Sequence, residues 1–482
     1  MKILLAGYNV DYNLIGELKE KSALKQELTP ETISAAYARI SRSPKPVNEL
    51  RQDSRAEVEK ARKSNRNIVF EMGHSSVAEH AVFNIDVIGV SRLLVEEIEK
   101  FRLCSYTEKS QRYVLFDKDF VVPEEIVEAG LKDVFVETVQ MQNDFYHQLY
   151  EQLRPYVFEQ NKALAENAAN KSMLEGWAKE DARYAIALAT ETQLGMTINA
   201  RNLELMLRRL AALPLAEARL YSEKLYAVTQ NIAPSLIRYT EATDYDRYTR
   251  HNLRAMGKKL PVPKVNQSQD VRLISSTQDA DTVAMASLLF ASSGLRYDHC
   301  LRQAKRMSLR DAKGLFKTVF ENIQPYDAVL RELENVDLLF ELILSASCFA
   351  QIKRHRMATI VSQDYDPALG VTLPKAVRAI GRQKEFMAMI KKTNSVYAII
   401  REKNPDAAAY VLTNAHRKRV LMKLNARELY HLARLRADAH AQWDIRELSE
   451  KMLKQARKVM PLTLMMACGK DGFAAQQKKY FP

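Results

Sequence analysis

The sequence predicts a helix-rich α+β protein made of two related halves. Glycine is scarce, with 14 among 482 residues, about 3% against a usual ~7%. That scarcity argues against sandwiches and propellers. Neither G-x-G-x-x-G nor G-x-x-x-x-G-K-[ST] occurs, so a classical dinucleotide-binding fold and a P-loop have no support. The third observation is an internal repeat, in which one order of strand-like and helix-like patterns occurs twice.

The repeated order is a strand, a helix, a second strand, a helix ending in basic residues, and a helix that opens with Asn-Ala-Arg. Alternating apolar residues predict the strands, and apolar residues at helical spacing predict the helices. Apolar residues at helical spacing from about 124 to 170 also predict a long helical hairpin, which forms core or an oligomer contact. The matching segments are 2–8 and 271–277, 83–90 and 336–344, 91–102 and 345–356, and 198–210 and 424–436.

The boundary between the halves is predicted at 257–270. Pro261 and Pro263 flank a polar stretch there without periodicity, which is typical of a linker. The first repeat is therefore expected at 1–256 and the second at 271–482.

Composition indicates a cytoplasmic protein with no membrane-spanning segment. The four cysteines are widely spaced without a C-x-x-C pair, which disfavours a disulfide framework and a thiolate zinc site. No stretch approaches the ~18 apolar residues of a membrane helix, and the N-terminus does not read as a secretory signal. The formal net charge of +13 favours anionic partners, either nucleic acid or phosphorylated small molecules. A basic surface without a dedicated ligand fits the charge equally well.

Two motifs in the first half contain residues capable of chemistry. In GHSSVAEH (73–80) the histidines are six residues apart, which is not the i, i+4 spacing of a helical metal pair, so we expect loop histidines and no metal. KFRLCSYTEKSQRY (100–113) combines hydroxyl groups with Glu108 and Arg112. Such donors suit an anionic or polar ligand, although a solvated turn has the same composition.

Arg436 is the strongest functional candidate in the second half. On one continuous helix, Asn425, Leu432, Arg436 and Trp443 would share a face that is at least partly buried. A buried arginine needs a partner, so its role differs from that of the surface arginines. The basic run 354–356 ends another helix, where cations complement the helix dipole.

These residues resemble the flavin-dependent thymidylate synthases. The resemblance rests on GHSSVAEH (73–80), SYTEKSQRY (105–113), the Arg-His-Arg run (354–356) and NARELYHLARLRADAHAQWDI (425–445). It covers most of both halves and is weak in the second half before residue 350. Because family members are single copies, the chain resembles two fused and diverged copies. The implied fold is a mixed sheet flanked by long helices, present twice.

The resemblance also implies how a site is shared between the halves. In the first half, Glu97, Lys100, Phe101 and Leu210 stand where the family has glutamine, two residues of its Arg-His-Arg run and the helix arginine. In the second half, Asp364, Asp366 and about Tyr410 stand where it has serine and two arginines. Each half keeps what the other has lost, which predicts one composite site between a first-half loop and a second-half helix.

The residues of that site follow from the matched motifs. Arg436 is expected to polarise the uracil ring as the catalytic residue. His431 stands where the family usually has a flavin-contacting asparagine. The expected nucleotide-binding residues are Glu108, Ser110, Arg112, Arg183, Gln351 and Arg354, and the expected flavin-binding residues are His74, Ser76, Glu79, Arg354, His355, Arg356, Asn425, Arg427 and His431.

The implied activity is FAD-dependent methyl transfer to C5 of dUMP, with methylenetetrahydrofolate and NADPH as co-substrates. No enzyme nucleophile is required, and Cys104 has no base in its motif. A homodimer forming a pseudo-tetramer is expected. Two alternatives stay open: a flavoenzyme acting on another pyrimidine nucleotide or folate substrate, and a non-catalytic nucleotide-binding, scaffold or nucleic-acid-binding relative. For a nucleic-acid binder we expect aromatic residues interleaved with basic ones on an exposed face, and we identify no such stripe in the sequence.

Overall fold

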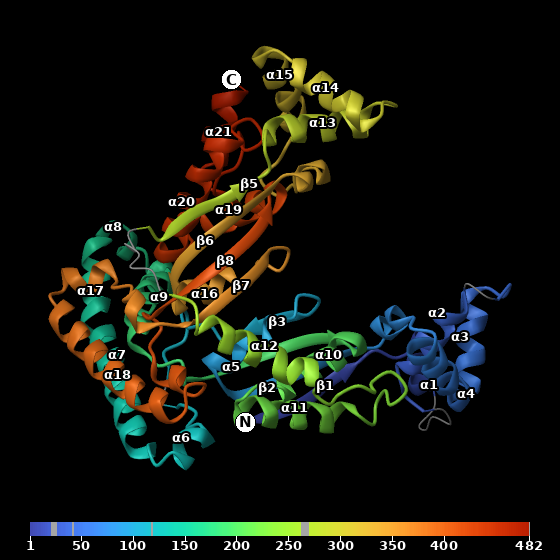
Figure 1. Cartoon of the computed structure of the whole chain (residues 1–482), viewed down its shortest axis with the longest axis horizontal. Coiled ribbons are helices and arrows are strands. Elements are labelled where there is room, and N and C mark those ends of the chain that lie inside the picture. Colours follow the sequence, from blue (N-terminus) through green and yellow to red (C-terminus); the bar gives the residue numbers. More distant parts are fainter. Residues whose placement is uncertain (21–26, 41–42, 117–118, 262–268, 482) are drawn as a thin grey trace. The chain divides into compact units, whose positions relative to one another are not determined.

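The structure, a computed structural model, describes residues 1–20, 27–40, 43–116, 119–261 and 269–481 (Figure 1). The chain divides into two compact units. Unit 1 comprises Met1–Lys179, Ile186–Pro263 and Glu385–Leu412, and unit 2 comprises Glu180–Ala185, Lys264–Lys384 and Thr413–Pro482. Each unit therefore contains a segment from the other half of the chain. Residues 262–268 of the predicted linker lie outside the described residues.

Each unit contains one four-stranded sheet, and the two sheets have the same topology. The strand orders are β1-β2-β4-β3 and β5-β6-β8-β7. Every neighbouring pair is antiparallel, so the sheets are not mixed as predicted. The reason is that the helical segment after β1, and likewise after β5, returns the chain to the same end of the sheet. The strands are β1 Lys2–Tyr8, β2 Val82–Ser91, β3 Ser105–Glu108, β4 Glu191–Asn199, β5 Val271–Ser276, β6 Asp337–Ser345, β7 Thr359–Tyr365 and β8 Arg417–Asn425.

The alternating patterns form the central strands, as predicted. In β2, Phe83 and Ile85 are buried while Asn84 between them is exposed. In β6, Leu338 and Phe340 are fully buried. One face of each strand therefore packs into the core of its unit.

Polar side chains start the repeated helices. Ser91 caps α5 (Arg92–Ile98) and Ser345 caps α16 (Ala346–Ile352), each by accepting a backbone N–H. Asn199 caps α10 (Ala200–Ala211) and Asn425 caps α19 (Ala426–Arg436) in the same way. The repeated Asn-Ala-Arg motif thus marks a helix start.

One prediction about α19 is wrong. The helix ends at Arg436, and Trp443 is the first residue of the next helix, α20 (Trp443–Val459). Six residues that leave the helical path separate them, so Trp443 does not continue the face of Arg436.

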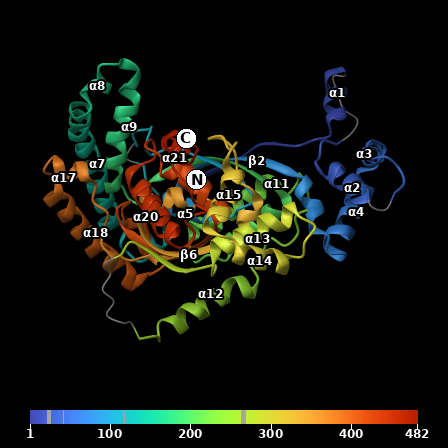
Figure 2. The same cartoon turned by 90° about the horizontal axis from the view of Figure 1, so that it is seen from above.

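In unit 1, two long helices from different halves of the chain lie side by side. They are α7 (Lys132–Gln160) and α18 (Gln383–Lys403) (Figures 1 and 2). The ring of Phe145 on α7 lies 6.2 Å from that of Phe386 on α18. The hairpin predicted at about 124–170 is there mainly one long helix, α7, whose apolar residues are buried, and the longer helix that follows, α9 (Lys171–Ala182), begins only after the predicted range. The other helices of unit 1 are α1 Tyr12–Glu20, α2 Glu31–Arg39, α3 Val47–Ala56, α4 Val58–Arg66, α6 Glu124–Glu128, α8 Lys162–Ala165, α11 Ala216–Thr229 and α12 Asp244–Gly257.

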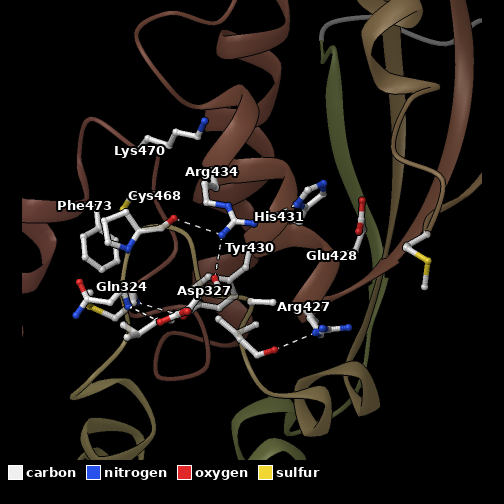
Figure 3. A pocket seen from close by; sticks show the side chains of 17 residues that line it. Gln324, Asp327, Arg427, Glu428, Tyr430, His431, Arg434, Cys468, Lys470 and Phe473 are labelled. Atoms are coloured by element: carbon white, nitrogen blue, oxygen red, sulfur yellow. Dashed lines mark hydrogen bonds between the residues drawn. The ribbon is translucent and has the colours of Figure 1, made fainter. Parts of the chain in front are cut away.

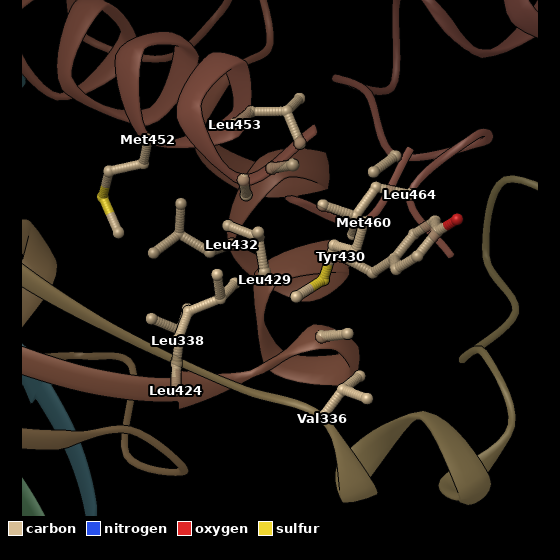
Figure 4. Packing of buried hydrophobic residues seen from close by; sticks show 14 of the residues in the cluster. Val336, Leu338, Leu424, Leu429, Tyr430, Leu432, Met452, Leu453, Met460 and Leu464 are labelled. Carbon is tan, nitrogen blue, oxygen red and sulfur yellow. The ribbon is translucent and has the colours of Figure 1, made fainter. Parts of the chain in front are cut away.

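The core of unit 2 packs α19 and α20 on the sheet (Figure 4). Leu429 and Leu432 of α19 lie among Leu338 of β6, Leu424 of β8 and Met452 of α20. Among the described residues, no helix has the length and apolar content that crossing a membrane requires. The other helices of unit 2 are α13 Ala280–Ser292, α14 Tyr297–Arg306, α15 Leu309–Phe320, α17 Lys375–Ala379 and α21 Phe473–Tyr480.

Candidate functional site

A buried chain of three side chains links the end of α16 to α19 in unit 2. His355 lies just after α16, and its Nδ1 is 3.0 Å from Oε1 of Glu428. From the last turn of α19, Nε of Arg436 donates to Nε2 of His355 at 3.2 Å. A terminal nitrogen of Arg436 also donates to the backbone oxygen of Gln351 at 3.5 Å. The candidate catalytic arginine is therefore held against the end of α16.

These partners determine the protonation of His355. A guanidinium only donates hydrogen bonds, so Nε2 of His355 accepts and the proton of the neutral ring is on Nδ1, facing Glu428. Burial is the main cause that lowers the pKa of His355, and Arg436 lowers it further while Glu428 opposes the shift. The histidine is therefore neutral at neutral pH.

The three residues of the Arg-His-Arg run differ in burial. His355 is buried, whereas Arg354 and Arg356 on either side of it are exposed. The two flanking cations thus face solvent, while the histidine between them is used inside the fold.

Arg183, from the first half of the sequence, belongs to unit 2 together with Gln351 and Arg436. It lies in a short turn, Arg183–Ala185, that a polar network anchors. The Tyr184 hydroxyl donates to Asp444 at 2.9 Å and accepts from Gln442 at 3.0 Å. Gln351 in turn donates to Gln442 at 3.4 Å. Arg183 is therefore brought into the same unit as the predicted site residues of the second half.

Sequence reasoning missed Tyr184, Gln442 and Asp444 in this network. Tyr184 directly follows the predicted Arg183, and the other two lie inside the motif 425–445. Their positions next to or inside the matched segments could have indicated that they belong to the site. Their contacts with one another join positions about 260 residues apart, which no local pattern can indicate.

A pocket of about 240 Å³ opens beside the hydrogen-bonded side chains of Glu428, His355 and Arg436 (Figure 3). Apolar side chains such as Val329, Met357 and Phe473 line it, and Arg427, Arg434 and Lys470 add positive charge. Backbone carbonyls hold two of the cations in place: Arg427 donates to Val329 at 2.9 Å and Arg434 donates to Asp327 at 2.9 Å. Burial raises the pKa of the Cys468 thiol in this pocket, which makes it a poor nucleophile. The remaining lining residues are Ile323, Gln324, Pro325, Ala328, Glu428, Tyr430, His431, Met466 and Gly469.

The arginine of each Asn-Ala-Arg motif pairs with a glutamate that precedes the second strand of its sheet. In unit 1, Arg201 pairs with Glu79 at 2.5 Å, and in unit 2, Arg427 pairs with Glu334 at 2.7 Å. Glu334 was missed by sequence analysis because its surroundings no longer match GHSSVAEH. Glu334 could have been found by counting back from the strand that follows, because RELEN (331–335) then aligns with SSVAEH and Glu334 with Glu79.

The other predicted residues of unit 1 lie in two places. His74, Ser76 and Glu79 belong to the turn before β2, where His74 and Ser76 are exposed. Glu108 ends β3, and its carboxylate forms a buried ion pair with Arg92.

Ser110 and Arg112 follow β3 and are half-buried. The Arg112 backbone N–H donates to the Ser110 hydroxyl at 3.1 Å, which shapes the turn that carries both. The pairing of Glu108, Ser110 and Arg112 with the residues of unit 2 stays a prediction.

In unit 2 a cluster of side chains from β8, α16 and the end of β7 lies where the corresponding loop begins. Lys418 is buried with its Nζ 3.9 Å from the ring centre of Tyr365 and 4.2 Å from that of Phe349, a cation–π arrangement. Asp366 caps the turn Pro367–Leu369. No arginine stands at the positions that match Ser110 and Arg112.

Strand pairing also corrects one position in this comparison. Glu191 pairs with Ser91 and Arg417 pairs with Ser345, so these residues start equivalent strands. Counting back along the chain from each strand, Arg183 corresponds to Ala409, not to Tyr410. Tyr410 instead corresponds to Tyr184, and it donates to Glu217 as Tyr184 donates to Asp444.

Comparison with known proteins places this arrangement in a family. The model of the family described as thymidylate synthase complementing protein matches residues 23–235 and 272–462. A UPF0159 protein of Chlamydia muridarum is 24% identical over 437 residues, which cover 86% of this chain and 82% of that protein. A flavin-dependent thymidylate synthase of Clostridium tetani is 29% identical over 241 residues, which cover 49% of this chain and 92% of that protein.

One solved structure is a weaker match. It is a UMP/dUMP methylase of Streptomyces cacaoi bound with 5-Br dUMP, at 16% identity and a TM-score of 0.33 over 42% of this chain and 94% of that chain, a likeness too low to bear on fold or ligand. The family model, by contrast, matches most of both halves. The chain therefore belongs to the thymidylate synthase complementing protein family, that of the flavin-dependent thymidylate synthases.

Proposed function

We propose that the chain is an FAD-dependent enzyme that transfers a methyl group to C5 of dUMP, with methylenetetrahydrofolate and NADPH as co-substrates. The observation that carries the proposal is the placement of Arg436. Its guanidinium is fixed by buried His355 and lies in one unit with Gln351 and Arg183. A preorganised cation of this kind stabilises negative charge that develops on a pyrimidine ring without reorganising during the reaction.

The roles of the remaining residues follow from their charge and exposure. Arg354 and Arg356 are exposed cations beside His355, suited to the phosphate groups of a nucleotide or cofactor. Arg112 and Ser110 add a cation and a hydroxyl from the loop of unit 1. We propose that these groups hold dUMP with the uracil ring next to Arg436, and that Glu108 shapes the loop through Arg92.

The pocket of unit 2 suits a flavin. Its apolar lining matches a planar aromatic ring, and Arg427, Arg434 and Lys470 match a pyrophosphate. Arg427 and His431 in its lining come from the matched motif 425–445, and Met357 directly follows the Arg-His-Arg run. When bound, FAD supplies the electrons that reduce the transferred one-carbon unit to a methyl group. The residues of the chain bind the flavin, exclude water and fix the nucleotide beside it.

Counting the flavin that the chain retains is the first test. The protein is incubated with FAD and desalted, and flavin absorbance is measured per chain. We expect about one FAD per chain, because only one set of matched site residues is complete. Two per chain would contradict the single composite site, and none would favour a non-catalytic binding protein.

Nucleotide dependence is the second part of the test. We expect dUMP to accelerate oxidation of the reduced flavin by methylenetetrahydrofolate, with dTMP as product by mass spectrometry. Arg112→Ala and Arg436→Ala should each weaken dUMP binding at least about tenfold, whereas Arg378→Ala, an exposed arginine of α17, should not. Unchanged dUMP affinity in both site variants would overturn the composite site. Retained flavin without dTMP formation would favour another pyrimidine nucleotide as substrate.

A further inference from the structure

Glu428 makes an unusual use of its position in α19. It is the third residue after the cap Asn425, where a glutamate commonly bonds back to the capping residue. Its backbone N–H donates to Asn425 at 2.8 Å, but its carboxylate faces Nδ1 of His355. The Glu428 side chain is only 7% exposed. The carboxylate is therefore largely desolvated, and its hydrogen bond with His355 offsets part of that cost.

The carboxylate selects one tautomer of His355. With the proton on Nδ1, the ring donates to Glu428 and its Nε2 accepts from Arg436. With the proton on Nε2, two donors would face each other at Arg436 and a lone pair would face the carboxylate. The tautomer that Glu428 favours is therefore the one that lets His355 hold the guanidinium.

The other half of the chain provides an internal comparison. The strand registers align Glu428 with Asn202, Arg436 with Leu210 and His355 with Phe101. All three members of the buried chain are thus replaced together in the half that has lost the arginine. In that half, Asn202 bonds locally to its capping residue Asn199.

We propose that Glu428 is a positioning residue that fixes the orientation of the Arg436 guanidinium through the Nδ1–H tautomer of His355. The proposal rests on the proposed function, in which Arg436 faces the pyrimidine. In this role Glu428 acts on the nucleotide only through His355 and Arg436. Its effect on the nucleotide therefore depends on Arg436 being present.

The tautomer is measured directly by NMR of the full chain labelled with ¹⁵N in its histidine rings. His355→Gln identifies the signal of His355. We expect a protonated Nδ1 and an unprotonated Nε2 in the wild-type chain and in Glu428→Gln, whose amide oxygen still accepts. In Glu428→Leu, which has no acceptor, the Nε2–H form should appear. A protonated Nε2 in the wild-type chain, or no change in Glu428→Leu, would overturn the proposal.

The link to Arg436 is measured by calorimetric titration of dUMP into the FAD-loaded chain. Glu428→Leu should weaken dUMP binding about tenfold, and Glu428→Gln much less. In the Arg436→Ala background, Glu428→Leu should cost no further affinity, because the group it positions is gone. Glu447→Leu on α20 removes a half-buried carboxylate that pairs with Lys375 of α17 and serves as the matched control.

The two hypotheses fail in different ways. If Arg436→Ala weakens dUMP binding but Glu428→Leu weakens it by the same factor in both backgrounds, the positioning role is wrong and the proposed function stands. If the wild-type chain does not bind dUMP, the proposed function is wrong. The NMR measurement needs no nucleotide, and it then decides whether Glu428 orients His355.

Discussion

Asp181 shows how strongly one buried carboxyl can depend on its surroundings. It accepts a hydrogen bond of 2.7 Å from the indole N–H of Trp443, and burial raises its pKa to about 7. The pKa of an unfolded aspartate is near 3.8. Between these values the folded state holds a proton that the unfolded state releases. Raising the pH from 4 to 7 therefore destabilises the fold through this group.

Asp181→Asn should stabilise the protein at alkaline pH. The amide oxygen keeps the bond from Trp443 and carries no charge to bury. The gain over wild type should be small near pH 4, grow up to pH 7 and reach at most about 4 kcal/mol. Urea unfolding of both proteins at several pH values measures it. Asp86→Asn, on the exposed face of β2, is the matched control, and a gain that does not grow with pH would contradict the assignment.

At the scale of elements, the contact between α7 and α18 depends on a buried amide. Gln142 of α7 donates to the Thr393 hydroxyl at 2.8 Å and to the backbone oxygen of Val411 at 2.9 Å. Both acceptors come from the second half of the sequence. The amide therefore ties two segments about 250 residues apart into one core.

Gln142→Leu should lower the free energy of unfolding by about 1–3 kcal/mol, because the Val411 carbonyl loses a buried donor. Gln140→Leu places the same substitution on the exposed side of α7 and should change stability little. Thermal or urea unfolding of the two variants compares them. Equal effects would show that the buried bond does not matter.

Local patterns predicted the elements well, for reasons that particular residues make clear. The alternation Phe83–Ile85 and the caps Ser345 and Asn425 act within a few residues, so the sequence displays them directly. The end of α19 at Arg436 was missed because 437–442 keep a helix-like composition. In the structure Asp438 accepts from the backbone N–H of His440 in this connection, and Gln442 caps the start of α20. Glu428 was missed as a partner of His355 because that contact joins distant segments.

Helix α12 adds a feature that the sequence analysis did not find. None of its residues is buried, and Tyr245 and Tyr248 alternate with Arg247 and Arg250 along it. This is an interleaving of aromatic and basic residues, and it keeps the nucleic-acid-binding alternative open. The stripe was not recognised in the sequence because composition does not show that every residue of this helix is at least partly exposed.

At the scale of the whole molecule, the exchange of segments between the units could not be predicted from sequence. Arg183 was expected in a first-half domain and lies in unit 2, and Tyr410 from the second half donates to Glu217 in unit 1. Sequence periodicity assigns consecutive segments to one domain. These contacts instead depend on which side chains are buried together by segments that are far apart in the sequence.

Cutting the chain between the halves should therefore leave them together. A protease site is placed at 262–268, and the cleaved protein is run on a native sizing column. We expect both fragments to co-elute, because α18 is part of the core of unit 1 through Phe386. A denaturing gel confirms cleavage. Separation of the fragments under native conditions would show that the exchanged segments do not hold them.

The same exchange changes what selection can do to the fold. In an assembly of identical subunits, equivalent contacts are encoded by the same codons. A mutation that is useful in one copy of the contact therefore changes every other copy as well. Here Tyr184 with Asp444 and Tyr410 with Glu217 are the same contact encoded by separate codons. Each can drift on its own, and this freedom explains how Phe101 and His355 came to occupy equivalent places with different chemistry.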